Sequence, residues 1–318
     1  MTRSLKAVPA GETAAAEKLK AVHAQLNRFI LGKEQQTRLC IACLLARGHL
    51  LIEDLPGVGK TTLAHALAKT LGLAYQRIQF TSDLLPADII GVSVYESESR
   101  QFNFHQGPIF SQLILADEVN RATPKTQSAL LEAMGEHQVT AEGNTFALPE
   151  PFFVVATQNP SYQIGTFPLP ESQLDRFLMR IRLGFPSNDA ERRLLKVGDT
   201  RELVDKAESV MTSKELVVLQ HRAAQLHVSD ALLDYVQALI RYTRESNRFD
   251  YGLSPRAALA FLRAARAWAF MDGRDAVIPE DVQSVAIGIL GHRLRYRESS
   301  DELQENIASE ILQNVPIP

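Results

Sequence analysis

Short apolar runs alternate with amphipathic stretches between residues 49 and 185. The apolar runs predict five strands, at residues 50–53, 75–80, 112–116, 152–156 and 177–183. The stretches between them carry the three-to-four-residue spacing of helices. Alternation of this kind is typical of parallel strands joined by crossover helices. We therefore predict an α/β domain built on a parallel five-stranded sheet.

Helical patterns fill most of the remaining chain. Residues 12–47 carry a helical period that is broken near residues 29–32, and Pro186-Ser187-Asn188-Asp189 is a turn with a helix start. Beyond it, helices are predicted at residues 214–225, 231–245, 255–271, 279–290 and 302–313. We expect two domains. Residues 1–186 hold the N-terminal helices and the α/β domain, and residues 187–318 form a smaller all-helical domain.

Two stretches inside the α/β domain alternate with period two. Residues 91–96 and 101–105 flank a polar turn at 97–100, and residues 138–141 and 145–148 flank a turn at 142–144. Both patterns predict β-hairpins. A parallel sheet does not need either hairpin to close, so we expect each to project from it; the alternative is that they cap the sheet edges.

The first strand runs into a glycine-rich turn and then a helix, which is the context of a phosphate-binding loop. Its residues are Pro56, Gly57, Val58, Gly59, Lys60, Thr61 and Thr62. The glycines allow backbone N–H groups to close around phosphate oxygens, and the helix N-terminus adds further donors. Lys60 can reach the terminal phosphates, and the Thr61 hydroxyl can bind Mg²⁺. This stretch predicts a nucleoside triphosphate site.

One position departs from the full phosphate-loop pattern, which starts with a glycine where this chain has Asp54. Aspartate tolerates left-handed backbone better than most residues, so we expect the loop to form. A carboxylate beside phosphates is unfavourable, however. The sequence therefore leaves open how Asp54 affects nucleotide affinity.

Polar side chains follow two further strands. Asp117 and Glu118 end an apolar run, at the strand edge where open α/β sheets bind ligands. We expect Asp117 to hold Mg²⁺ through water and Glu118 to deprotonate the attacking water. Asn159 follows the next strand and can bind that water or the γ-phosphate; the alternative is a turn before Pro160. The same stretch lacks the Asn-Lys-x-Asp pattern with which GTPases read guanine.

Two arginines are candidates to complete the site. Arg256 lies in the first turn of a predicted helix, after Ser254-Pro255, where a cation opposes the helix dipole and a phosphate would relieve that conflict. Arg176 precedes the last strand and could reach the γ-phosphate of a neighbouring subunit. Each alone would more often be a surface ion-pair residue.

Composition excludes several classes of protein. Among 318 residues, 45% are hydrophobic and 22% charged, which describes an ordinary globular protein. A net charge of −3 gives no bulk attraction to nucleic acid or anionic membrane. We find no apolar run long enough to span a bilayer and no apolar signal core in residues 1–20. We expect a cytoplasmic protein that binds no nucleic acid and inserts in no membrane.

The two cysteines, Cys40 and Cys43, lie in an apolar helical stretch without a second pair, which favours two buried thiols over a redox or zinc site. The eight histidines show no zinc-binding spacing. We expect no metal other than Mg²⁺.

With these motifs in place, the chain resembles MoxR-family AAA+ ATPases from about residue 20 to its end. The resemblance rests on Pro56–Thr61, on the run Ala116-Asp117-Glu118-Val119-Asn120-Arg121-Ala122 with the residues that follow to Met134, on Ala156–Pro160 and on Leu169–Phe177. It implies that Lys60 and Thr61 are the Walker A residues, Asp117 and Glu118 the Walker B residues, and Asn159 sensor 1.

The resemblance also implies that Arg176 is an arginine finger and Arg256 is sensor 2. Leu31 and Gly32 resemble the segment that contacts adenine, with Lys33 where glutamine is usual. The hairpins resemble the helix-2 insert and the pre-sensor hairpin of this AAA+ clade, and the C-terminal helices resemble its lid domain. Members of the family form homo-oligomeric rings, often hexamers. They act as chaperones on partner proteins, frequently ones with von Willebrand factor A domains.

We thus predict Mg²⁺-dependent ATP hydrolysis that drives remodelling or activation of a partner protein. One alternative is a scaffold that assembles on ATP with little turnover. Others are a nucleic-acid motor, which the near-neutral charge disfavours, and the ATPase subunit of a metal-chelatase-type complex.

Overall fold

The structure is a computed structural model. It describes residues 10–98, 100–159, 166–297 and 306–317. A parallel five-stranded sheet lies at the centre, in the strand order β2-β5-β8-β1-β9. Its strands are β1 (Leu50–Glu53), β2 (Tyr75–Gln79), β5 (Leu113–Asp117), β8 (Phe153–Gln158) and β9 (Met179–Ile181). All five predicted strands are therefore present, although β9 is shorter than expected. The α/β fold is confirmed.

Alternate residues of the central strands divide between two hydrophobic cores. In β1, Leu50 and Ile52 pack into one core, while Leu51 packs into the other. In β5, Leu113 and Leu115 join the first core and Ile114 the second. This period-two alternation fixes the sheet register, because a slip of one residue would exchange the two faces.

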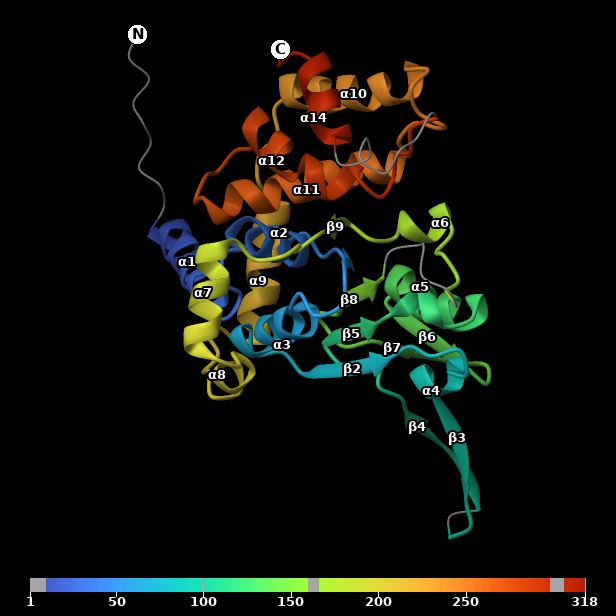
Figure 1. Cartoon of the computed structure of the whole chain (residues 1–318). Helices are drawn as coiled ribbons and strands as arrows, with labels where there is room; N and C mark the ends of the chain where they lie inside the picture. Colours follow the sequence, from blue (N-terminus) through green and yellow to red (C-terminus); the bar gives the residue numbers. More distant parts are fainter. Residues whose placement is uncertain (1–9, 99, 160–165, 298–305, 318) are drawn as a thin grey trace.

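Helices pack on the sheet and continue into the helical domain (Figure 1). The helices around the sheet are α1 (Ala10–Phe29), α2 (Glu34–Leu45), α3 (Lys60–Thr70), α4 (Pro86–Ile90), α5 (Pro124–Glu136) and α6 (Glu171–Leu174), with a 3-10 turn at Val119–Arg121. Cys40 and Cys43 are buried in α2 as free thiols, as predicted, and burial raises the pKa of both.

The C-terminal part is helical in its described residues. It contains α7 (Asn188–Val197), α8 (Arg201–Asp205), α9 (Ser213–Ala224), α10 (Asp230–Glu245), α11 (Pro255–Met271), α12 (Pro279–Leu290) and α14 (Ile307–Asn314). The bounds of α11 and α12 match the prediction, because proline occupies the first turn of each. The first residues of the helix predicted at 302–313 lie outside the described residues. The domain boundary expected after residue 186 stays a prediction. No helix among the described residues has the length and apolar character needed to cross a membrane.

Both predicted hairpins are present as separate two-stranded sheets: β3 (Gly91–Glu96) with β4 (Gln101–Gln106), and β6 (Gln138–Ala141) with β7 (Asn144–Ala147). The β3–β4 ribbon projects far from the body of the molecule (Figure 1). At its base, Phe104 stacks on Phe146 of the second hairpin, with ring centroids 4.3 Å apart, and Phe110 packs edge-on against both. The two hairpins are thus joined by one aromatic cluster.

Candidate nucleotide-binding site

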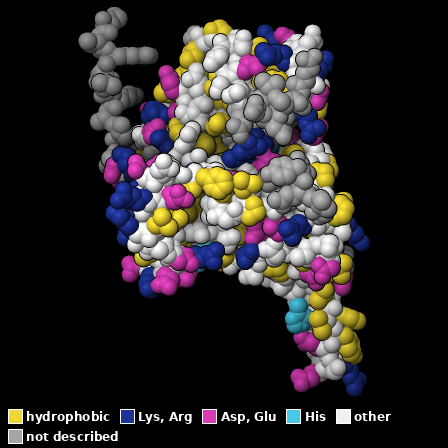
Figure 2. Space-filling model, in the orientation of Figure 1, with side chains coloured by type: hydrophobic (Ala, Val, Ile, Leu, Met, Phe, Trp, Pro, Cys, Tyr) yellow, Lys and Arg dark blue, Asp and Glu magenta, His cyan; other side chains and the backbone are white. Residues whose placement is uncertain are grey.

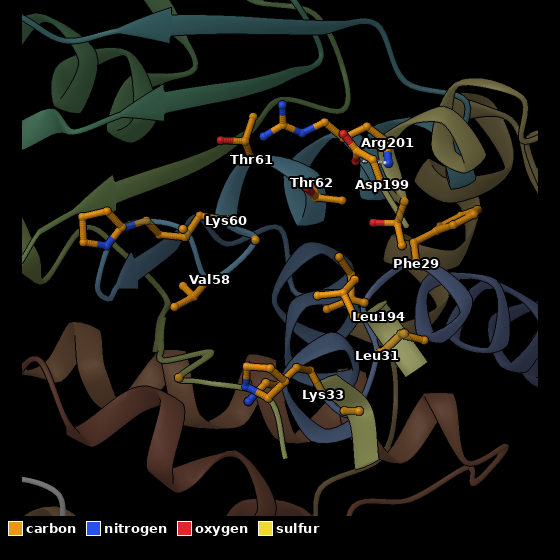
Figure 3. A pocket seen from close by; sticks show the side chains of 18 of the residues that line it. Phe29, Leu31, Lys33, Val58, Lys60, Thr61, Thr62, Leu194, Asp199 and Arg201 are labelled. Carbon is orange, nitrogen blue, oxygen red and sulfur yellow. Dashed lines mark hydrogen bonds between the residues drawn. The ribbon is translucent and has the colours of Figure 1, made fainter. Parts of the chain in front are cut away.

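A cleft of about 560 Å³ opens at the carboxyl end of β1, within the size range of ligand pockets. Figure 3 shows its walls. Lys60, Thr61 and Thr62 come from the start of α3, Leu31 and Lys33 from the connection between α1 and α2, and Leu194, Asp199 and Arg201 from α7, α8 and the link between them. The cleft therefore lies between the glycine-rich loop and the first helices of the C-terminal part.

The glycine-rich loop has the backbone that its sequence requires. Gly57 and Gly59 have φ values of +84° and +97°, which are strained for other residues. A Cβ atom at either glycine would meet nothing within 4 Å, so the space above the loop is open. The helix α3 begins at Lys60, directly after this turn, and its N-terminus faces the same cleft. An anion such as a phosphate fits this combination of free N–H groups and helix dipole.

Lys60 is the buried cation of the cleft. Its ammonium group donates a 2.7 Å hydrogen bond to the backbone carbonyl of Asp54 and a 3.3 Å bond to Oδ1 of Asn159. Burial lowers the pKa of Lys60, while the carboxylates of Asp54, Asp117 and Glu118 oppose this by raising it. Negative charge thus lies close to Lys60, and two of these carboxylates, Asp117 and Glu118, also line the cleft.

The expectation for Asp54 is wrong in two respects. Its backbone does not have a positive φ, so tolerance of left-handed conformation plays no part. Its carboxylate also does not line the cleft. Oδ2 accepts hydrogen bonds from the amides of Leu183 and Gly184, both at 2.6 Å, and Oδ1 accepts from Leu55. Asp54 therefore ties the phosphate-binding loop to the chain that follows β9, rather than facing the phosphates.

The strands β5 and β8 bring the predicted acidic and amide residues together. The hydroxyl of Thr157 on β8 bonds both acidic residues. It donates to Oδ1 of Asp117 at 2.6 Å and accepts from the backbone amide of Glu118 at 2.8 Å. Oδ2 of Asp117 forms an ion pair with Arg77 at 2.7 Å. Glu118 has a φ of +56°, a left-handed backbone that few residues other than glycine adopt.

Asn159 connects the lysine to the glutamate. Its Oδ1 accepts from Lys60, and its Nδ2 donates to Oε1 of Glu118 at 3.1 Å. The other oxygen of Glu118 accepts from Gln79 at 3.1 Å and from Arg121 at 2.9 Å. The three predicted motifs therefore form one hydrogen-bonded chain across the cleft.

Thr61 and Asp117 both line this cleft, and their side chains carry the kind of oxygen ligand that Mg²⁺ prefers. Mg²⁺ keeps several waters and needs only one or two protein oxygens beside substrate phosphates. The residues present thus fit a phosphate-bound magnesium ion.

Away from Lys60, the cleft is lined by the apolar side chains of Phe29, Leu31 and Leu194 and by the charged side chains of Asp199 and Arg201 (Figure 3). Gly32 has a φ of +70°, and a Cβ atom there would lie 2.8 Å from the Cβ of Ala190. The α1–α2 connection therefore approaches α7 closely, which narrows this end of the cleft.

Neither Arg176 nor Arg256 is among the described residues that line the cleft. Arg176 lies against α5, where its guanidinium donates a 2.7 Å hydrogen bond to the carbonyl of Leu131. Arg256 is exposed in the first turn of α11. Within one chain, the structure does not bring either arginine to the glycine-rich loop.

Sequence reasoning missed several residues of the site: Arg77, Gln79, Arg121, Thr157, Asp199 and Arg201. Arg77 and Gln79 share one face of β2, whose register places Gln79 beside Asp117. Two polar residues spaced by two at the end of a strand were the available signal. Using it requires knowing that β2 and β5 are neighbours.

Comparison with known proteins agrees with this geometry. Residues 49–179 match the ATPase family associated with various cellular activities (AAA), and residues 241–314 match the AAA lid domain. The chain is 43% identical to the uncharacterized protein YeaC of Bacillus subtilis, over 94% of each chain. It is 41% identical to the chaperone MoxR1 of Mycobacterium tuberculosis, over 92% of this chain and 81% of MoxR1.

Among solved structures, a Cytophaga hutchinsonii protein assigned as an ATPase superposes with a TM-score of 0.85 at 36% identity, covering 96% of this chain and 97% of that one. The chain belongs to the MoxR family of AAA+ ATPases, and it is an ATPase.

Proposed function

We propose that this MoxR-family ATPase uses Mg²⁺-dependent ATP hydrolysis, in a ring of identical subunits, to remodel a partner protein. The observation that carries the proposal is the hydrogen-bonded chain from Lys60 through Asn159 to Glu118, which borders the open space above the glycine-rich loop.

In this proposal, the phosphates are bound by Lys60 and by the backbone amides of residues 57–62. The adenine binds at the end of the cleft beside Leu31 and Gly32. Lys60 is suited to this because burial disfavours its charged form, and the negative charge of a bound phosphate would stabilise that form. Thr61 and Asp117 would hold Mg²⁺, which neutralises phosphate charge when bound.

Glu118 serves as the general base for the attacking water. Its left-handed backbone and its contact with Asn159 aim the carboxylate along the cleft edge. Asn159 holds Glu118 and Lys60 at a fixed separation, so the base and the phosphate-binding cation are positioned by one amide.

The positions of the two arginines support the proposed ring. Arg176 points onto α5, away from the cleft of its own chain, so as an arginine finger it would serve a neighbouring subunit. Arg256 at the exposed start of α11 would sense phosphate after movement of the lid helices. We propose a hexamer, the assembly common in the family.

The β3–β4 ribbon is the proposed contact for the partner. Figure 2 shows hydrophobic side chains gathered along this projection. Val92, Val94 and Tyr95 are exposed, and Phe102 is 71% exposed, whereas Phe104 is held in the aromatic cluster at the base. Exposed apolar surface on a ribbon of this kind marks a protein interaction site. MoxR1 of Mycobacterium tuberculosis is a chaperone. We propose a partner with a von Willebrand factor A domain.

The test is a comparison of nucleotide binding with turnover. Lys60→Ala is expected to lose ATP binding, because phosphate charge goes uncompensated, while Glu118→Gln keeps binding and loses hydrolysis. Equal ATP affinity in Lys60→Ala and the wild type would refute the assigned site. Binding with negligible turnover in the wild type would instead support an ATP-gated scaffold.

A further inference from the structure

One carboxylate joins the α/β part of the chain to two helices of the C-terminal part. Asp175 ends the short helix α6 and directly precedes Arg176. Its Oδ1 accepts a 2.7 Å hydrogen bond from Nε of Arg293, and its Oδ2 accepts a 3.0 Å bond from the hydroxyl of Ser254. Ser254 precedes α11 and Arg293 follows α12, so both donors belong to the helical part.

Arg293 forms hydrogen bonds with the backbone on both sides of Arg176. Its guanidinium donates to the carbonyls of Asp175, Phe177 and Leu178 as well as to the Asp175 carboxylate. The Arg293 side chain is only 4% exposed. Because water is excluded, these bonds are strong and a displacement of Arg293 would leave several groups unpaired.

Ser254 connects the same carboxylate to Arg256. Its Oγ caps α11 by accepting a 3.1 Å hydrogen bond from the amide of Ala257. The same hydroxyl donates a hydrogen bond to the Asp175 carboxylate. Arg256 lies two residues further, in the first turn of that helix. A rotation of α11 that moves Arg256 would therefore also displace Asp175, the residue next to Arg176, through its hydrogen bond with Ser254.

The side chain of Arg176 is held from another direction. Its guanidinium rests on the carbonyl of Leu131 in α5, and a Cβ atom at Gly135 of the same helix would lie 2.5 Å from Nη1. The backbone of residue 176 thus follows the C-terminal helices, while its side chain lies against α5. A shift between these two supports changes where the guanidinium points.

We propose that Asp175 is a positioning residue through which the lid of one subunit sets the arginine finger that acts on the next subunit. The inference rests on the proposed roles of Arg176 and Arg256. Its content is the direction of coupling: a change at the start of α11 alters hydrolysis in the neighbour, and does so through Asp175, Ser254 and Arg293.

Mixed rings test this direction. Donor subunits carry Glu118→Gln, so they supply a finger but hydrolyse nothing. Acceptor subunits carry Arg176→Ala, so they hydrolyse only with a finger from a donor. Ser254→Asp is then placed in either the donor or the acceptor. Aspartate still caps α11, but its charge repels Asp175 and removes the connecting hydrogen bond.

We expect Ser254→Asp in the donor to lower the ATPase rate of mixed rings by roughly two- to tenfold, the range for loss of one hydrogen bond. In the acceptor, which has no finger to position, the effect should be smaller. The matched control is Ser229→Asp, because Ser229 caps α10 in the same way through the amide of Leu232. It should leave the mixed rate unchanged in either subunit.

Two results would overturn the proposal. One is a loss of ATPase rate with Ser254→Asp in the acceptor that equals or exceeds the loss with it in the donor. The other is a loss with Ser254→Asp in the donor no larger than the loss with Ser229→Asp. The baseline separates this from failure of the proposed function. If donor and acceptor without further changes fail to restore activity, while the wild type hydrolyses ATP, the finger assignment itself is wrong and the coupling falls with it.

Discussion

The position of Asp54 allows a prediction against the consensus. Asp54→Gly would complete the standard phosphate-loop pattern, and a sequence comparison alone would expect an improved protein. The structure predicts the opposite. The carboxylate accepts from the amides of Leu55, Leu183 and Gly184, and the backbone has no positive φ for glycine to relieve.

The cost follows from the bonds that are lost. Asp54 is 8% exposed and Leu183 is 2% exposed, so water cannot readily replace the carboxylate. Hydrogen bonds to a charged acceptor are worth about 1.5–3 kcal/mol each. Counting the two short bonds to Oδ2, we expect Asp54→Gly to lower the free energy of unfolding by about 3–6 kcal/mol. Asp54→Asn can keep one acceptor oxygen and should cost about 1–2 kcal/mol.

Urea unfolding of the wild type and both variants measures this difference. Asp83→Gly is the control, because Asp83 is exposed in the loop after β2 and its replacement should change stability by less than about 1 kcal/mol. ATP affinity, measured in parallel, should not rise in Asp54→Gly, since the carboxylate does not line the cleft. An Asp54→Gly protein as stable as the wild type would refute the reasoning.

Three further predictions concern the site, the core and the ribbon. Thr157→Val removes the hydroxyl between Asp117 and Glu118, so kcat should fall about tenfold or more, with a smaller change in ATP binding measured by calorimetry. Burial lowers the pKa of His49 to about 3, so below pH 6.5 the unfolded chain takes up a proton that the folded chain does not. Urea titrations should then show stability falling by about 1.4 kcal/mol per pH unit from this residue, and a shallower slope in His49→Gln. Phe102→Ser should leave stability and basal ATPase unchanged but weaken pull-down of a von Willebrand A-domain protein, whereas unchanged capture would exclude this side of the ribbon.

The sequence was sufficient wherever the chemistry is local. The glycine-rich loop, the strand before it and the proline-started helices α11 and α12 are each specified by neighbouring residues, and the structure has them where expected. Asp117 and Asn159 were found for a related reason: the carboxyl ends of parallel strands meet at one edge.

The sequence was insufficient where partners lie far apart in the chain. Asp54 meets Leu183 and Gly184 about 130 residues later, a pairing that depends on β9 lying beside β1. Thr157 gains its role only from the neighbouring strand β5. Among the aromatic residues of the hairpins, the alternating pattern alone did not separate exposed Phe102 from Phe104, because the second hairpin supplies the stacking partner.

The burial of Cys40 and Cys43 has a practical consequence for experiments on movement. These are the two cysteines of the chain, and both thiols are enclosed in α2 with a raised pKa. Thiol-directed dyes react with the exposed thiolate, so the native protein should remain unlabelled at neutral pH. A single cysteine introduced at position 102 therefore gives a site-specific fluorescent probe on the projecting ribbon without prior removal of native thiols. Its signal during ATP turnover would report the motion of the ribbon directly.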